Sequence, residues 1–306
     1  RGNPKAGGGK ESLKAYLDLT RAHFAVCWPL LFCSGLLLAF ERYGSFSASL
    51  LIRAALLGLF GLEAGMVMND YVDREIDERD VDLEGLTGYW RPFNKRPIPA
   101  GLISPRQALA LFWVLVGLCL ILVATLPWPN ALYLLAIMPA SFLLQYFYQV
   151  HKRKQRWPLA QLVGRIDVTL FPVAGYLCLG HPDSTALALF LFYYPWILAH
   201  LAVNDLADLE NDRARGLKSV AVLLGTRGTA LWIVAASAAQ VLVSPLLLAH
   251  VGAVGQAGIV AGFGVLAAAA YVVWRGQDRA AALKALPLLH LTMALYVGLI
   301  ILDYFL

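Results

Sequence analysis

From residue 22 onward the chain alternates between long apolar runs and shorter polar segments. Each run is about 20 residues long, the length that an α-helix needs to cross the hydrocarbon core of a bilayer. Because lipid offers no hydrogen-bond partner to an open backbone, we interpret the runs as helices. Nine spans are predicted, at residues 22–40, 48–69, 107–126, 130–149, 158–180, 185–204, 228–249, 252–274 and 285–305.

The polar segments predict the rest of the architecture. Residues 1–20 are interpreted as a flexible tail followed by an interfacial segment. The connections at 70–106 and 205–227 are long, and long loops inside a compact protein are usually functional, so we expect them to cap one mouth of the bundle. The prediction for residues 1–306 is one all-α domain, a polytopic bundle of nine transmembrane helices around a central cavity.

Composition and charge support a multi-pass membrane protein and give its orientation. The chain is 59% hydrophobic and 15% charged, whereas a soluble domain carries about 25% charged residues. Of its 25 Lys and Arg residues, 22 fall on the side of the N-terminal tail, and only Arg42 and Arg53 fall on the other. The positive-inside rule therefore places the predicted cap in the cytoplasm. Since the net charge of +5 comes from this asymmetry, we expect no nucleic-acid partner.

One polar pattern, N-D-x-x-D-x-x-x-D, occurs twice, each time directly after an apolar run. On a helix, spacings of three and four place the aspartates of each copy on one stripe. Mg²⁺ takes a few carboxylate oxygens from protein and fills its shell with substrate phosphates. Two facing stripes therefore predict two Mg²⁺ ions bridged by a diphosphate, and identical spacing makes a plain solvated helix end the weaker interpretation. The candidate ligands are Asn69, Asp70, Asp73, Asp77, Asp205, Asp208 and Asp212.

Basic residues lie close to both copies in the sequence. Lys95 and Arg96 lie in a segment whose prolines and glycine restrict the backbone. Lys152 follows the fourth span, and Lys218 follows the second acidic copy. Arg and Lys are the usual ligands of phosphate oxygens. The alternative for each of them is ordinary positive-inside charge.

Three further polar residues lie inside spans. Charges within a membrane are costly and mark functional sites by default, which applies to Arg165 and Asp167. Two residues apart on a helix, they should not face each other, so we expect each to meet a partner on another span or in the cavity. His200 shares a helix face with Asn204 and either reaches the cavity or packs as a core histidine.

These motifs resemble the signatures of the UbiA superfamily of intramembrane prenyltransferases. Residues 69–77 followed by the R-P-x-P-x-G element at 96–101 resemble the first signature, and residues 205–219 resemble the second. Tyr148-x-x-x-Lys152 resembles the Y-x-x-x-K element of the family. One departure is the insertion at 78–94, which carries extra acids and a Tyr-Trp-Arg-Pro run. It lies where an acceptor should enter, so we expect it to govern acceptor specificity.

The resemblance implies Mg²⁺-dependent transfer of a polyprenyl group from an allylic polyprenyl diphosphate to a lipophilic or aromatic acceptor, with release of diphosphate. The residues expected to carry the chemistry are Asp73, Asp208, Lys95 and Arg96. Those expected to bind substrate are Tyr148, Lys152, Lys218, Arg165, Arg21 and His200.

Three other functions remain open from the sequence. A terpene cyclase of the same superfamily would use the same metals without an acceptor. A CDP-alcohol phosphotransferase would need a D-G-x-x-A-R core, which the chain lacks. A cation transporter would place acids near the bilayer midplane in broken helices, whereas both acidic copies lie at span ends.

The repeated aspartates give the first testable prediction. Asp73→Ala or Asp208→Ala is expected to abolish prenyl transfer while leaving the fold intact, because each would lose a metal ligand. Product formation by the purified variants measures this. Near-normal turnover in either variant would refute the two-metal interpretation.

Overall fold

The computed structural model describes residues 9–82 and 84–306, so the first eight residues of the predicted tail lie outside the described part. Within it every regular element is helical. The elements are α1 (Gly9–Leu19), the 3₁₀ turn η1 (Ala22–Phe24), α2 (Cys27–Tyr43), α3 (Ala48–Asp77), α4 (Leu86–Trp90), α5 (Pro105–Ala124), α6 (Asn130–His151), the π-helical turn η2 (Ala160–Gly164), α7 (Ile166–Leu177), α8 (Ser184–Ala207), α9 (Leu209–Arg215), α10 (Val220–Leu248), α11 (Ala253–Gly276) and α12 (Arg279–Phe305).

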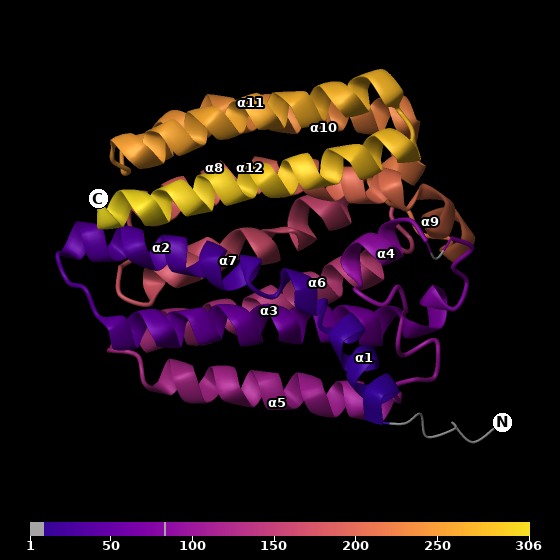
Figure 1. Cartoon of the computed structure of the whole chain (residues 1–306), viewed down its shortest axis with the longest axis horizontal. Coiled ribbons are helices and arrows are strands. Elements are labelled where there is room, and N and C mark those ends of the chain that lie inside the picture. The colour runs from indigo at the N-terminus through magenta and orange to yellow at the C-terminus, as the bar shows by residue number, and fades with distance from the viewer. Residues whose placement is uncertain (1–8, 83) are drawn as a thin grey trace.

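The long helices lie side by side in one bundle, and the short helices α1, α4 and α9 gather at one end of it (Figure 1). The C-terminus lies at the opposite end (Figure 1). The predicted all-α membrane bundle is confirmed. In the described residues eight helices are long and apolar enough to cross a membrane, so the predicted count of nine is not confirmed.

The predicted span that differs is 158–180. It consists of the π-helical turn η2 and the 12-residue helix α7, joined at Arg165. Gly164 packs tightly on α6 at this junction, because a Cβ there would lie 2.5 Å from the Cβ of Tyr148. The missing side chain at Gly164 therefore allows the segment to lie close to α6 at the point where the regular helix is interrupted.

Both acidic copies differ from the predicted loop boundaries. The first lies on α3, which continues as a helix to Asp77, so the residues predicted to open a cap loop at 70 are helical. The second is divided between two helices, because Asp208 has φ −105° and ψ 13° and separates α8 from α9. Its aspartates therefore do not lie on a single helical stripe as predicted.

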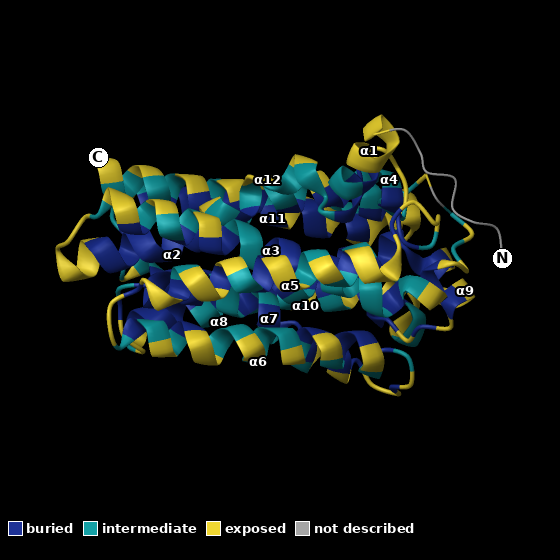
Figure 2. Ribbon diagram, turned by 90° about the horizontal axis from the view of Figure 1, so that it is seen from below, coloured by how far each residue is buried: buried dark blue, intermediate teal, exposed yellow. Residues whose placement is uncertain are grey.

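Burial distinguishes central helices from peripheral ones. The apolar stretch of α8 is 67% buried and that of Ala22–Tyr43, which contains α2, is 61% buried, whereas that of α6 is only 11% buried. Along the outer helices buried and exposed residues alternate as stripes (Figure 2). The exposed positions include large apolar side chains such as Trp113, Leu143 and Leu242, as a surface facing lipid requires.

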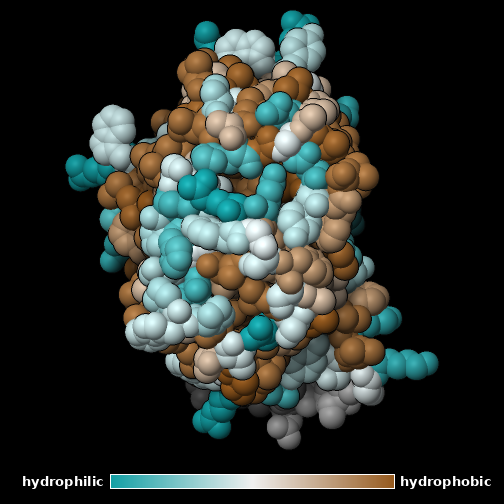
Figure 3. Space-filling model, turned by 90° about the vertical axis from the view of Figure 1, so that its left-hand side faces the viewer, coloured by the Kyte–Doolittle hydropathy of each residue, from teal (hydrophilic) through white to brown (hydrophobic). Residues whose placement is uncertain are grey.

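The end of the bundle opposite to α4 and α9 is tied together by polar contacts. Arg42 Nε lies 2.9 Å from the Asp183 carboxylate, and the Tyr176 hydroxyl donates to the same carboxylate at 2.8 Å. Asp183 also accepts the backbone N–H groups of Thr185 and Ala186 at the start of α8. Hydrophilic side chains gather in the middle of this end face, with hydrophobic ones around them (Figure 3).

Close packing of α2 on α7 depends on two glycines. A Cβ at Gly175 would lie 1.8 Å from the carbonyl oxygen of Phe32, and one at Gly35 would lie 2.0 Å from that of Pro172. Small residues allow membrane helices to approach this closely. Since the obstructing atoms belong to the backbone, a side chain at either position forces the two helices apart.

We predict that Gly175→Ala lowers the free energy of unfolding by about 1–3 kcal/mol, the usual cost of overpacking. Gly117→Ala is the matched control, because a Cβ added at this position on α5 would meet no atom within 4 Å. Thermal unfolding in detergent, followed by tryptophan fluorescence, compares the two. Equal melting temperatures would contradict the proposed role of Gly175.

Candidate functional site

A polar cavity of about 210 Å³ lies at the end of the bundle that carries α4 and α9. It brings together most of the predicted site residues, which come from α3, α6, α8, α9 and several connecting segments. Those that line it are Arg21, Asn69, Asp73, Asp77, Arg96, Tyr148, Lys152, Arg165, His200, Asp205, Asp208 and Asp212. Residues far apart in the sequence therefore form one site.

Three predicted residues do not line the cavity. Asp70 is held by two ion pairs, to Arg21 at 3.0 Å and to Arg91 at 2.7 Å. Lys95 and Lys218 have exposed side chains, and only their backbone groups contact the surrounding loops. The structure therefore does not bring either lysine ammonium group to the acidic residues.

The first acidic wall, on α3, is paired with basic side chains. Lys152 Nζ lies 2.8 Å from Asp73, and Arg96 Nη1 lies 2.8 Å from Asp77. Arg153 adds a second pair to Asp73 at 3.0 Å. All the carboxylates of this wall are buried, where an unpaired charge would be costly.

The second acidic wall bends at Asp208. Its carboxylate accepts a hydrogen bond from Asn211 Nδ2 at 2.7 Å, and Asp205 accepts the backbone N–H of Val220 at 2.9 Å. Burial and the neighbouring Asp205 and Asp208 carboxylates raise the pKa of Asp212 well above its ordinary value. Crowding of buried carboxylates on this wall therefore disfavours the ionised form of Asp212.

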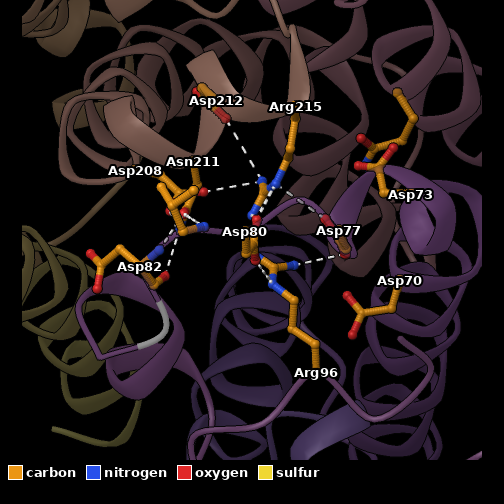
Figure 4. Close-up of polar contacts among 12 residues, drawn as sticks. Asp70, Asp73, Asp77, Asp80, Asp82, Arg96, Asp208, Asn211, Asp212 and Arg215 are labelled. Carbon is orange, nitrogen blue, oxygen red and sulfur yellow. Dashed lines mark hydrogen bonds and ion pairs between the residues drawn. The ribbon is translucent and has the colours of Figure 1, made fainter. Parts of the chain in front are cut away.

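Arg215 joins the two walls, and the sequence reasoning missed it. Its guanidinium lies between Asp77 on α3 and Asp208 and Asp212 on the other side (Figure 4), at 3.5, 3.2 and 3.8 Å. It also pairs with Asp80 in the insertion. Burial would lower the pKa of Arg215, but these four carboxylates raise it above its ordinary value. Only the three-dimensional arrangement identifies this residue, because its sequence context resembles any interfacial arginine.

The insertion at 78–94 contacts both acidic copies. Arg91 binds Asp70 of the first copy, and Trp90 Nε1 donates to Asn204 of the second at 2.8 Å. Asn211 fixes the start of the insertion, because its amide oxygen accepts the backbone N–H groups of Val81 and Asp82, each at 2.9 Å. The charged and aromatic residues of the insertion were visible in the sequence, but the residues with which they pair could not be predicted from it.

Arg165 differs from its prediction. Its Nη1 lies 3.5 Å from Asp167 Oδ2, so the expectation that these two side chains would not meet is wrong. The reason is the helix break, because Arg165 ends the π-helical turn and precedes α7. The guanidinium lies over the Tyr148 ring, 3.5 Å from its centroid. Its Nε and Nη2 atoms are buried and have no hydrogen-bond partner among the described residues.

A second, mainly apolar pocket of about 140 Å³ adjoins the cavity. It lies among α3, α5, α6 and α7, and Arg165 lines both spaces. Leu62, Met66, Asn69 and Val168 are also shared between them. The site therefore passes from a charged chamber into an apolar groove within the bundle.

Several aromatic residues line the polar cavity. Tyr148 and Trp196 do so, together with Trp28 and Trp90. Tyr193, on the same helix as Trp196, is instead buried in the core. Ring faces attract cations, which makes the cavity suited to positive charge as well as to metal-bound anions.

The donor set fits a hard divalent cation. Carboxylate and amide oxygens from both walls face one cavity, and Mg²⁺ prefers oxygen ligands, of which the protein supplies only one or two. In residues 9–82 and 84–306, no three His, Cys, Asp or Glu side chains converge to form a complete metal cage. Several of the carboxylates contact basic side chains instead. A cation bound here would therefore take its remaining oxygen ligands from a phosphate-bearing molecule.

Known proteins resemble this chain in sequence. The sequence model of the UbiA prenyltransferase family matches residues 26–296. The chain is 32% identical over 223 residues to a protein of Hydrogenovibrio crunogenus named 4-hydroxybenzoate octaprenyltransferase, with 71% of this chain and 72% of the relative covered.

Solved structures share the fold. A UbiA homolog from Aeropyrum pernix K1 superposes with a TM-score of 0.73 at 22% identity, covering 92% of this chain and 98% of that chain. A UbiA homolog from Archaeoglobus fulgidus, solved bound to GPP and Mg²⁺, gives a TM-score of 0.68 at 19% identity and covers 95% of this chain and 100% of that chain.

We predict that Arg215→Gln destabilises the protein by about 3–5 kcal/mol without divalent ions, because buried carboxylates lose their shared cation. Added Mg²⁺ should then raise the melting temperature of the variant more than that of the wild type. Arg213→Gln, on the same helix, is the control, because Arg213 is 57% exposed and pairs with the exposed Glu210. An equal Mg²⁺ shift in all three proteins would contradict this role of Arg215.

Proposed function

The chain belongs to the UbiA prenyltransferase family, and from this premise we propose that it transfers a prenyl group from an allylic polyprenyl diphosphate to a lipophilic or aromatic acceptor. The family match, over residues 26–296, confirms the predicted family and enzyme class. Long apolar helices confirm an integral, multi-pass membrane protein. What the proposal adds is the assignment of donor, acceptor and metal to particular residues.

The assignment of the prenyl donor rests on the surroundings of Arg165. Two of its guanidinium nitrogens are buried without a partner among the described residues, at the boundary between the charged cavity and the apolar groove. Buried guanidinium N–H groups that have no acceptor are costly unless a ligand satisfies them. An allylic diphosphate has the matching shape, with an anionic head for the cavity and a hydrocarbon tail for the groove.

Mg²⁺ would be held by Asn69, Asp73 and Asp77 on one wall and by Asp205, Asp208 and Asp212 on the other. We propose two ions, which neutralise the diphosphate and make it a better leaving group when bound. Asp70 is assigned a supporting role, because it positions Arg21 and Arg91 rather than facing the cavity.

The protein's own groups would complete the diphosphate site. Lys152 and Arg96 already lie against the acidic residues, at 2.8 Å from Asp73 and Asp77. As the C–O bond breaks, fixed positive groups stabilise the charge that develops on the leaving oxygen. Tyr148 turns its ring toward the Arg165 guanidinium at 3.5 Å and so orients it at the entrance to the groove.

We assign the acceptor to the aromatic part of the cavity lining. Trp90 and Trp196 line the cavity next to His200, with ring centroids 6.1 and 5.1 Å from its ring, and Trp28 lines it as well. Their ring faces suit both an allylic cation and an aromatic acceptor. The name of the relative from Hydrogenovibrio crunogenus favours a hydroxylated aromatic acid as the first acceptor to test. The charge asymmetry of the loops supports a cavity that opens to the cytoplasm.

Purified protein with Mg²⁺, geranyl diphosphate and a panel of acceptors that includes 4-hydroxybenzoate tests the proposal by mass spectrometry. We expect a prenylated acceptor and released diphosphate, and no product when Mg²⁺ is chelated. A cyclised hydrocarbon formed without acceptor would identify a terpene cyclase instead. Movement of labelled cation across liposomes without prenyl transfer would identify a transporter.

Arg165→Gln is predicted to raise the KM for geranyl diphosphate about 10- to 100-fold, as expected from the loss of hydrogen bonds to a charged group. The KM for the acceptor should change much less. Arg53→Gln serves as the control, because Arg53 binds Thr125 on another surface and does not line the cavity. Equal KM values for wild type and Arg165→Gln would contradict the donor assignment.

A further inference from the structure

We propose that Thr87 and Arg91 bind a carboxylate group of the acceptor, an inference that rests on the proposed function. Both residues belong to the insertion at 78–94, and both line the polar cavity. The ligand class that they would select is an aromatic carboxylic acid. The insertion would then determine which acceptors the protein accepts through two named side chains.

Each of the two side chains carries a buried polar atom that has no partner. Thr87 is 2% exposed, and its hydroxyl forms no hydrogen bond with any described residue. Arg91 is 3% exposed. Its Nη2 donates to Asp70 at 2.7 Å, whereas its Nε has no hydrogen-bond partner in the described part of the chain. Buried N–H and O–H groups without an acceptor are costly. Two such donors in the lining of one cavity point to a ligand that supplies acceptor oxygens.

The two donors lie one helical turn apart. The Arg91 backbone N–H donates to the Thr87 carbonyl oxygen at 2.9 Å and closes the last turn of α4. Residues four apart on a helix are neighbours on its surface. A carboxylate has two oxygens, so one would accept the Thr87 hydroxyl and the other the Arg91 Nε–H.

The charges around Arg91 favour an anion over a neutral ligand. Asp70 pairs with Arg21 at 3.0 Å as well as with Arg91. Asp18, another carboxylate near Arg91, accepts two backbone N–H groups instead and forms no ion pair with Arg91 among the described residues. One carboxylate therefore serves two guanidinium groups. A bound carboxylate supplies a second negative charge through the charge-assisted hydrogen bonds typical of arginine.

The same segment provides apolar surface next to the two donors. Leu86 and Trp90 also line the cavity, and the Trp90 ring lies 6.1 Å from that of His200, measured between centroids. Flat apolar side chains suit an aromatic ring. An aromatic acid therefore matches this part of the lining better than the diphosphate does, because the proposed metal ligands lie on α3, α8 and α9.

Three consecutive residues of the insertion hold α4 in place, each through a contact to a different long helix. The contacts are Tyr89 to His290 on α12 at 2.5 Å, Trp90 to Asn204 on α8 at 2.8 Å, and Arg91 to Asp70 on α3 at 2.7 Å. The two donors are thus positioned by the fold before a ligand binds. Such preorganisation lowers the entropic cost of binding.

Thr87→Val tests the site with little change of shape. The acceptors to compare are 4-hydroxybenzoate and its methyl ester, with geranyl diphosphate and Mg²⁺, because the ester keeps the ring and the hydroxyl but carries no charge. We expect the wild type to prefer the acid. The variant should raise the KM for the acid about 10- to 100-fold, as expected from the loss of a hydrogen bond to a charged group. The KM values for the ester and for geranyl diphosphate should change much less.

Arg91→Gln removes the positive charge together with the Nε donor, so the preference for the acid over the ester should disappear. Thr292→Val is the matched control for the loss of a buried hydroxyl. The Thr292 hydroxyl donates to the Leu288 carbonyl oxygen at 2.9 Å on α12, and Thr292 does not line the cavity. Its removal should leave both KM values and the preference for the acid unchanged.

Melting temperatures without ligands separate acceptor binding from a structural role. The Thr87 hydroxyl has no hydrogen bond to lose, and burying such a group is costly. Thr87→Val should therefore melt no lower than the wild type. A lower melting temperature would show that the hydroxyl is bonded within the protein and would contradict the proposed site.

The remaining outcomes distinguish this site from the proposed function. The same ratio of kcat/KM for acid and ester in the wild type and both variants would overturn the carboxylate site while the proposed function stands. The same holds if only the KM for geranyl diphosphate rises, or if the wild type prenylates only acceptors that lack a carboxylate. No prenylation of any acceptor by the wild type would overturn the proposed function and the carboxylate site with it.

Discussion

Repulsion among buried carboxylates is the constraint on which the rest of this site depends. Two walls of aspartates face one cavity, and at 4 Å two like charges interact by about 4 kcal/mol at an effective dielectric constant of 20. Basic side chains pair with both walls, and Arg215 contacts Asp77 on one wall and Asp208 on the other. The same partners surround the space where we place the diphosphate. Stability of the protein and recognition of the substrate therefore depend on one set of charges.

The periodicity of apolar and acidic residues predicted the helices and the grouping of the aspartates. Apolar runs predicted the helices, and the repeated spacing predicted that Asp73 and Asp208 would share one site, as the cavity shows. Two of the predictions that were wrong concern places where a helix is interrupted. At Asp208 the backbone leaves helical geometry, and at Arg165 a break allows contact with Asp167 two residues away.

The sequence also could not predict which basic residues pair with the aspartates. Lys95 and Arg96 are adjacent and equally basic, yet only Arg96 reaches the cavity, while Lys95 is exposed. Which of two neighbours faces inward depends on how the segment docks, and Asp18 decides this by accepting the backbone N–H groups of Phe93 and Lys95 at 2.7 and 3.1 Å. Partners this distant in the sequence leave no periodic signal, which is also why Arg215 was missed.

The two acidic walls differ in stiffness, and the insertion compensates for the difference. The first wall is the end of a continuous 30-residue helix. The second crosses a break at Asp208 into the seven-residue helix α9, so its aspartates are positioned by tertiary contacts rather than by one helix. Asn211 supplies such a contact by binding both Asp208 and the backbone at Asp82. Because the same insertion also binds Asp70 through Arg91, it holds the spacing of the two walls. Residues 78–94, which we propose to lie at the acceptor side, thus also help to fix the geometry of the proposed metal–diphosphate site, and a change of acceptor specificity within them would be constrained by that second role.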